Sequence, residues 1–244
     1  MAQITYEEWF VRMKYPGHEQ AVIDPETGLP KDWTQKPLSE ITTYINRGIA
    51  PKYVEEDGFF VINQKCIRNK YINFEEARLT SSKKRVDENK LLKCFDILVN
   101  STGTGTLGRV AQLMIEPDKV TVDTHVTIVR GNDNVSKLYL GRTLELLQPF
   151  IESLGKGATN QQELGRLDLA SIVKINIPPK ELQLKFDAIA SPIYQVIPKL
   201  REQNQHLQEA RDILLPRLMT GMIDVETLSV PEPLSNETLE DHAV

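Results

Sequence analysis

Residues 180–216 read KELQLKFDAIASPIYQVIPKLREQNQHLQEARDILLP, and this stretch decides the C-terminal part of the fold. Apolar residues recur there at alternating steps of four and three from Leu182 to Leu214, with one polar break at Gln203. Such a heptad pattern is typical of a coiled-coil helix. A helix of about 36 residues is ~54 Å long, whereas a compact domain of ~180 residues is about 32 Å across. Much of the stripe therefore requires a partner helix, although an amphipathic helix lying on its own domain is the ordinary alternative.

Two prolines, Pro192 and Pro198, fall inside this stretch, and each removes a helical hydrogen bond. They predict a kink or a break into two helices, and the unbroken heptad favours a kink. Pro216 and Gly221 are expected to end the segment. We therefore expect a spacer helix at 180–216, an extension at 217–230 and an acidic disordered tail at 231–244.

Residues 1–179 alternate short apolar segments with turn residues, which is typical of a mixed α/β domain with many short strands. The first 36 residues are expected to be mainly loop. Helices are expected near 5–13, 38–44 and 138–154. Strands are expected at 59–63, 70–74, 96–100, 109–115, 124–129 and 172–177.

The chain has 244 residues and a formal net charge of −5, but the charge is uneven. Residues 1–179 hold 23 basic and 23 acidic side chains, while residues 222–244 hold six acids and no base. Residues 60–110 carry a net charge of +5, and Lys83, Lys84 and Arg85 form a basic cluster within them. This regional balance leaves a nucleic-acid partner open, although a charge cluster is commonly only a solvated surface.

The N-terminus has no basic region before an apolar stretch, and no apolar run is long enough to cross a membrane. Cys66 and Cys94 stand alone, without disulfide or metal spacing. These features predict a cytoplasmic protein without a membrane segment.

Residues Gly103–Gly108 match the pattern G-x-G-x-x-G after a predicted strand. An NAD- or FAD-dependent enzyme with Asp123 as its ribose acid requires a helix to open directly after the glycines. Arg109 instead begins an apolar segment that looks like a strand. A turn that offers hydroxyls, backbone N–H groups and Arg109 to a nucleic acid fits better, and an ordinary glycine hairpin is an equal alternative.

A polar segment, 156–163, carries side chains suited to base-edge hydrogen bonds, and a polar cap on the next turn is an equally good interpretation. The four histidines lack metal-ligand spacing. His125 is interpreted as a core histidine of a strand rather than as a general base. No nucleophile elbow, Walker A loop or zinc protease motif is present, which lowers the expectation of an enzyme.

The sequence resembles the specificity (S) subunit of type I restriction-modification systems over nearly all of residues 5–225. The stretches that carry the resemblance are RGIAPKY (47–53), INQKCIR (62–68), FDILVNSTGTGTLGRVA (95–111), GKGATNQQEL (155–164), IPP (177–179) and QEARDILLPRLMTGMI (208–223). One departure lies at KELQLKF (180–186), where Leu182 replaces the usual acid, so the local helix cap is in doubt.

The resemblance implies a non-catalytic, half-length subunit with one target recognition domain (1–179) and one spacer helix. It implies a homodimer through an antiparallel coiled coil, double-stranded DNA as ligand, and methyltransferase (M) and restriction (R) subunits as partners. S-adenosylmethionine, ATP and Mg²⁺ would belong to those partners, with no cofactor in this chain. The expected dimerisation residues are Phe186, Ile189, Ile193, Val196, Leu200, Leu207 and Leu214. The expected DNA-binding residues are Lys52, Tyr53, Lys65, Arg68, Lys83, Lys84, Thr102, Thr104, Thr106, Arg109, Lys156, Thr159, Asn160 and Gln161. A coiled-coil interaction or inhibitory protein is the remaining non-catalytic alternative.

Overall fold

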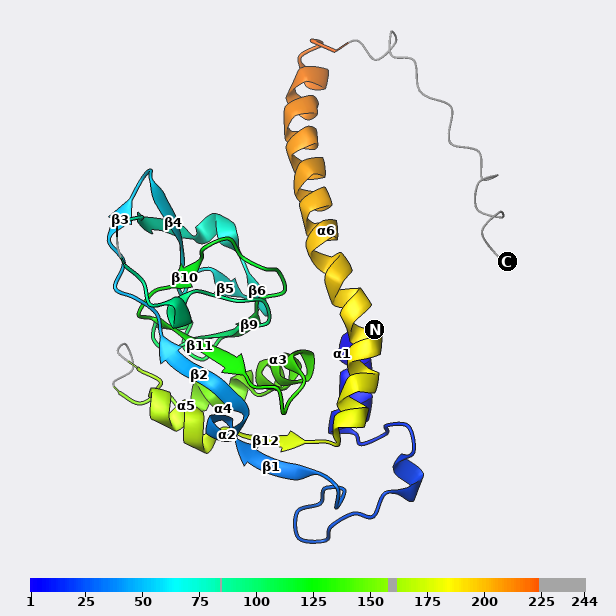
Figure 1. The fold of residues 1–244 in the computed structure, drawn as a ribbon. Helices are drawn as coiled ribbons and strands as arrows, with labels where there is room; N and C mark the ends of the chain where they lie inside the picture. Colours follow the sequence, from blue (N-terminus) through cyan, green and yellow to red (C-terminus); the bar gives the residue numbers. More distant parts are fainter. Residues whose placement is uncertain (84, 158–161, 224–244) are drawn as a thin grey trace, which may run out of the picture. The chain divides into compact units, whose positions relative to one another are not determined.

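The computed structural model describes residues 1–83, 85–157 and 162–223 and divides the chain into two compact units, Met1–Pro198 and Lys199–Val244. The α-helices are α1 (Ala2–Tyr6), α2 (Leu38–Ile41), α3 (Lys137–Leu146), α4 (Gln148–Ser153), α5 (Arg166–Ile172) and α6 (Lys180–Met219) (Figure 1). The strands are β1 (Thr34–Pro37), β2 (Thr42–Arg47), β3 (Tyr53–Val54), β4 (Gly58–Ile62), β5 (Ile67–Arg68), β6 (Tyr71–Ile72), β7 (Arg78–Ser81), β8 (Ile97–Asn100), β9 (Val110–Gln112), β10 (Thr121–Val122), β11 (Val126–Gly131) and β12 (Lys174–Ile177).

Two four-stranded sheets form the body of the first unit. One is antiparallel, in the order β2-β11-β8-β9, and the other has the order β10-β4-β7-β3, with β10 parallel to β4. Strands β1 and β12 pair antiparallel. A strand from the N-terminal part of the chain therefore holds the strand that directly precedes α6. The predicted mixed α/β class with many short strands and a long C-terminal helix is confirmed.

The antiparallel sheet is buried on both faces. Along β8, Ile97 and Val99 belong to one apolar core, whereas Leu98 between them belongs to another. Along β11, Ile128 and Val129 divide in the same way. This alternation follows from the two-residue period of a strand, and it explains why these strands read as continuous apolar runs in the sequence.

An aromatic cluster joins the N-terminus to the beginning of α6. The ring of Phe186 lies 5.3 Å from that of Phe10 and 5.8 Å from that of Tyr6, and Tyr139 of α3 lies 4.7 Å from Phe10. The N-terminal residues are therefore part of the core: α1 continues into a π-helical segment, η1 (Glu7–Val11), where a helix was expected.

The compact unit runs to Pro198, past the expected domain boundary at residue 179. The reason is that the beginning of α6 supplies core residues, among them Leu182, Phe186 and Ala190. The helix α6 continues through Pro192 and Pro198, so it does not break into two. Pro216 also lies inside it, and the expected end at that residue is wrong: α6 ends at Met219, just before Gly221 at φ +69°.

The expected helix over 138–154 is wrong in one respect, because it is two helices. The first ends at Leu146, and α4 begins at Gln148 with Pro149 in its first turn, a position that proline favours. The strand expected at 124–129 begins only at Val126, and that expected at 172–177 begins at Lys174 because Ile172 closes α5. Residues 38–44 split between α2 and β2.

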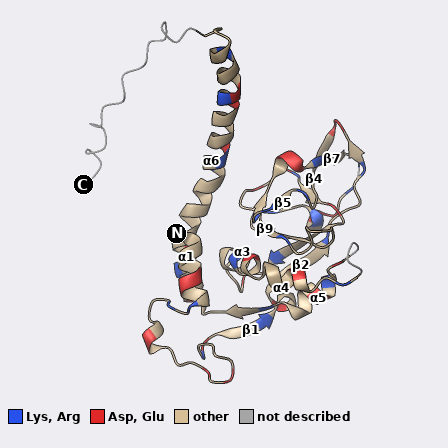
Figure 2. Cartoon of the chain, turned by 180° about the vertical axis from the view of Figure 1, so that it is seen from behind, with Lys and Arg blue, Asp and Glu red and all other residues tan. Residues whose placement is uncertain are grey.

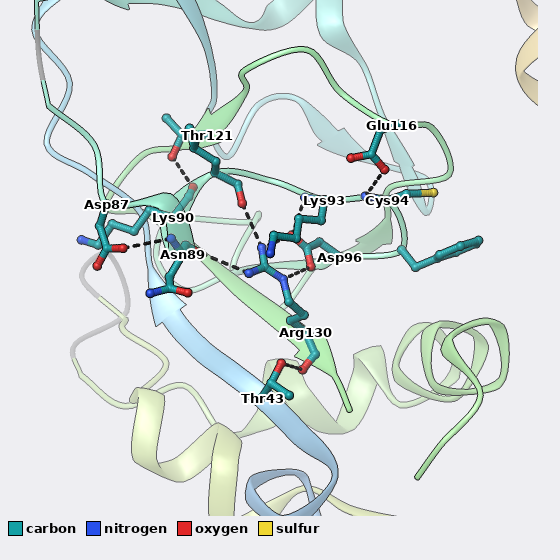
Figure 3. Close-up of polar contacts among 12 residues, drawn as sticks. Thr43, Asp87, Asn89, Lys90, Lys93, Cys94, Asp96, Glu116, Thr121 and Arg130 are labelled. Carbon is teal, nitrogen blue, oxygen red and sulfur yellow. Dashed lines mark hydrogen bonds and ion pairs between the residues drawn. The ribbon is translucent and has the colours of Figure 1, made fainter. Parts of the chain in front are cut away.

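A buried ion pair fixes the segment between the two sheets (Figure 3). Arg130 of β11 contacts the carboxylate of Asp96, whose side chain is 1% exposed, and its Nη2 also donates to the carbonyl oxygen of Leu91 at 2.9 Å. Asp96 in turn accepts from the backbone N–H of Lys93 at 2.8 Å. One guanidinium thus holds the chain over 89–96 in place.

Candidate nucleic-acid interface

The ends of two parallel strands define a polar cleft. Strands β4 and β10 run in the same direction, so the residues that follow them meet at one edge of the sheet. Strand β7 is antiparallel to β4, and it begins at that same edge with Arg78, which is opposite Val61. The resulting cleft has a volume of about 420 Å³, and it is lined by Tyr53, Asn63, Gln64, Lys65, Glu75, Glu76, Ala77, Arg78, Asp123 and His125.

One wall of the cleft is a stacked pair. The guanidinium carbon of Arg78 lies 3.6 Å from the centroid of the Tyr53 ring. Tyr53 is opposite Thr80 in the β3–β7 pairing, which places Arg78 two residues along on the same face. Stacking holds the guanidinium plane in one orientation without consuming its N–H donors.

His125 stands at another wall, and the expectation that it is a core residue is wrong. It is exposed, because it lies in the turn before β11 rather than inside the strand. Its Nδ1 is hydrogen-bonded to Thr102 Oγ1 at 2.6 Å, and its backbone N–H donates to Asp123 Oδ1 at 2.8 Å. Burial of Asp123 raises the pKa of its carboxyl, and the His125 N–H and the imidazole act in the opposite direction.

The glycine turn Gly103–Gly108 connects β8 to β9, which pair antiparallel. A strand therefore follows the glycines, and the turn lacks the helix N-terminus that a dinucleotide site requires. Arg109 closes the turn: its Nη2 donates to the carbonyl oxygen of Gly105 at 2.9 Å and its Nη1 to that of Ile67 at 3.3 Å. The dinucleotide alternative is thus contradicted by the geometry.

The segment after α4 lies beside this turn. Thr102 and Lys156 each form an isolated β-bridge with Glu163, and the backbone N–H of Leu164 donates to the carbonyl oxygen of Ser101 at 2.8 Å. Arg47 of β2 adds an ion pair with Glu163 at 2.7 Å. The glycine turn and the segment after α4, which are about 50 residues apart in the sequence, are therefore adjacent in the fold.

The structure brings some of the expected DNA-binding residues together and leaves others apart. Tyr53 and Lys65 line the cleft, and Thr102 reaches it through His125. Lys156 forms an ion pair with Asp168 at 2.9 Å. Lys84, Thr159, Asn160 and Gln161 lie outside the described residues. Lys52, Arg68, Lys83 and Thr104 are exposed but do not line the cleft, and Thr106 and Arg109 hold the glycine turn.

The basic residues of 60–110 are accompanied by acidic residues in the fold. Figure 2 shows both acidic and basic positions along the ribbon around β4, β7 and β9. Glu75 and Glu76 of the short helix η3 (Phe74–Glu76) line the same cleft as Lys65 and Arg78. Gln64, Arg78 and His125 line the cleft without having been predicted as binding residues, because their proximity arises from strand order, which no local pattern contains.

The helix α6 carries two different faces. Phe186 is fully buried, so the structure removes it from the expected dimerisation residues, and Ile193 is half-buried against the same core. The other expected dimerisation residues are exposed: Ile189 and Val196 in the first unit, and Leu200, Leu207 and Leu214 in the second, with exposed fractions between 42% and 67%. Exposed apolar residues at heptad spacing are typical of coiled-coil helices.

A mixed α/β domain followed by a long helix with an apolar stripe also occurs in solved structures, and two curated proteins are similar to this chain in sequence. The chain is 27% identical over 239 residues to the type I restriction enzyme MjaIX specificity subunit of Methanocaldococcus jannaschii, covering 91% of this chain and 52% of that protein. It is 25% identical to the putative type I restriction enzyme MjaX specificity subunit of the same organism, covering 79% and 46%. No family model matches the chain.

Solved structures share the fold. The HsdS subunit from Thermoanaerobacter tengcongensis aligns over 88% of this chain and 49% of its own, with a TM-score of 0.52 and 17% identity. The S subunit of a type I restriction-modification system from M. genitalium aligns over 81% and 49%, with a TM-score of 0.53 and 16% identity. The predicted resemblance to type I specificity subunits is confirmed, and the chain spans about half the length of the relatives it matches.

Two negative findings apply to the described part of the chain. No helix within 1–83, 85–157 and 162–223 combines the length and apolarity that a membrane crossing requires. Among the same residues, no three His, Cys, Asp or Glu side chains are grouped so as to hold a metal ion.

Proposed function

We propose that this chain is a non-catalytic DNA-sequence specificity subunit of a type I restriction-modification system, in a half-length form. Its α/β domain binds one half-site of a bipartite duplex target, and α6 pairs with the α6 of a second copy. The observation that carries the proposal is the combination of one such domain with a helix whose heptad residues Ile189, Val196, Leu200, Leu207 and Leu214 are exposed.

The similarity to specificity subunits over about half their length supports the half-length form. Two copies would restore two recognition domains and two spacer helices. A two-fold axis through an antiparallel coiled coil makes the two domains equivalent, so they must bind identical half-sites. The expected target is therefore a palindrome interrupted by a spacer.

In the proposed cytoplasmic complex, the chain positions methyltransferase and restriction subunits on this target. S-adenosylmethionine, ATP and Mg²⁺ act in those partners. The chain's own contribution is affinity and register: the side chains around the glycine turn and the cleft contact the duplex, and the coiled coil fixes the distance between half-sites.

Co-expression with a methyltransferase subunit, followed by mapping of methylated bases in the host genome, tests the proposal. We expect methylation at one bipartite palindromic motif. A bipartite motif with two different halves would assign the second half to another chain. Binding to the methyltransferase without any methylation would contradict the proposal and favour the inhibitory alternative.

A further inference from the structure

We propose that the cleft between β4, β7 and β10 reads a base of the half-site, with Gln64, Arg78 and His125 as specificity-determining residues. This inference rests on the proposed function and adds which surface of the domain distinguishes sequences. It depends on four observations: the charge balance of the cleft, its hydrogen-bonding groups, an acceptor without a partner, and the support of the imidazole.

The charges of the cleft do not suit a phosphate. Lys65 and Arg78 are its cations, and Glu75, Glu76 and Asp123 line the same cleft. Sites that bind the DNA backbone instead gather lysine and arginine without acids nearby. Base edges present both hydrogen-bond donors and acceptors, and the cleft carries side chains of both kinds.

The side chains of the cleft offer the donor and acceptor geometry used on bases. Arginine forms paired hydrogen bonds with guanine, and glutamine does so with adenine. Arg78 is held in one plane by Tyr53, with its guanidinium carbon 3.6 Å from the ring centroid. Gln64 lines the same cleft, in the segment that follows β4. Arg78 is therefore supported by an aromatic ring, and Gln64 adds a carboxamide to the same cleft.

The carboxamide of Gln64 has an unsatisfied acceptor. Its Oε1 is shielded from solvent and has no hydrogen-bond partner among the described residues. Leaving such an acceptor unpaired destabilises a folded protein. Gly103 lies close by: a Cβ at that position would be 3.3 Å from the Gln64 carboxamide and 2.3 Å from Thr106 Oγ1. The glycine thus leaves room for the amide at the edge of the cleft.

Thr102 is a positioning residue for His125. The hydrogen bond of 2.6 Å between Thr102 Oγ1 and Nδ1 fixes the imidazole, so Nε2 is the nitrogen left to meet a ligand. Thr102 begins the glycine turn, and its backbone bridges to Glu163. A change in that turn would therefore alter how His125 is presented without changing His125 itself.

The test uses the full chain in complex with a methyltransferase subunit, with the methylated motif as readout. We expect Gln64→Ala and His125→Ala to relax the motif at one position, with about a tenfold loss of discrimination there and the rest of the motif unchanged. Thr102→Val should relax a position that His125→Ala also relaxes, and Thr102→Ser, which keeps the hydroxyl, should restore it. Gln20→Ala, an exposed glutamine outside the cleft, is the matched control.

The outcomes separate this inference from the proposed function. If the wild-type complex methylates a bipartite motif and the cleft variants keep every position of it, the cleft does not read bases and only this inference fails. A uniform loss of methylation with an unchanged motif has the same meaning. If an alanine variant does not assemble, Gln64→Leu and His125→Gln take its place under the same criteria. If the wild-type complex methylates no bipartite motif, the proposed function fails and the inference fails with it.

Discussion

Arg130 and Asp96 form a two-point ion pair inside the domain: Nε lies 2.7 Å from Oδ1, and Nη2 lies 2.7 Å from Oδ2 (Figure 3). The Asp96 side chain is 1% exposed and that of Arg130 is 14% exposed. Water therefore screens the pair little, and removing either side chain would leave the other charge buried without a partner.

The first prediction concerns this pair. Arg130→Met leaves a buried carboxylate without its cation and removes the donors to Leu91 and Asn89, so we expect the free energy of unfolding to fall by about 3–5 kcal/mol. Urea denaturation followed by circular dichroism measures it. Lys137→Met is the control, because its ion pair with Asp133 is exposed and 3.7 Å long, and it should cost less than about 1 kcal/mol. Equal losses in the two variants would contradict the structural role of Arg130.

Strands β8 and β11 were predictable from sequence, because apolar runs of four to six residues carry a local signal. Strands of two residues, such as β3, β5 and β10, carry almost none, and their pairing depends on the rest of the fold. The long helix was predictable from its heptad. Its division into a buried and an exposed face was not, because Phe186 and Ile189 are alike in pattern and differ only in what the N-terminal aromatic residues cover.

The second prediction concerns Glu145 of α3, which is 2% exposed. Burial raises the pKa of its carboxyl to about 7, while contact with Arg142 and the more distant Lys70 acts in the opposite direction. Because the folded pKa lies above the unfolded value of 4.5, the folded state binds this proton more tightly. The contribution of Glu145 to the free energy of unfolding is therefore fully present below about pH 4.5. It is lost as the pH rises to about 7, by roughly 2–3 kcal/mol.

Urea denaturation from pH 4.5 to 8 measures this dependence. We expect Glu145→Gln to flatten the decline in the free energy of unfolding, because an amide does not titrate. Glu40→Gln, at an exposed position, should keep the wild-type slope. A Glu145→Gln protein with the same slope as the wild type would assign the pH dependence to other groups.

The third prediction concerns the glycine turn. Arg109 donates to two backbone carbonyl oxygens, so we expect Arg109→Ala to weaken duplex binding by loosening the turn, with little change in salt dependence. Lys52 is exposed and lies outside the cleft, and a lysine that contacts a phosphate contributes about one unit to the slope of log affinity against log salt. Lys52→Ala therefore separates an electrostatic contact from a turn support. Fluorescence anisotropy at several salt concentrations gives both quantities. Unchanged affinity and slope for Arg109→Ala would show that the turn does not contribute to DNA binding.

The fourth prediction concerns the exposed stripe of α6. Leu207 is 67% exposed and Leu200 is 52% exposed, one heptad apart. A lysine at either position places a charge in the seam of an antiparallel coiled coil, and we expect the dimer to dissociate at least tenfold more readily. Leu184→Lys is the matched control, because this leucine is 55% exposed but lies outside the heptad positions and should leave the dimer intact. Sedimentation equilibrium at micromolar concentration measures the mass of each protein. A wild-type chain that is strictly monomeric under these conditions would exclude the homodimer. The exposed heptad residues would then pair with the helix of a different chain.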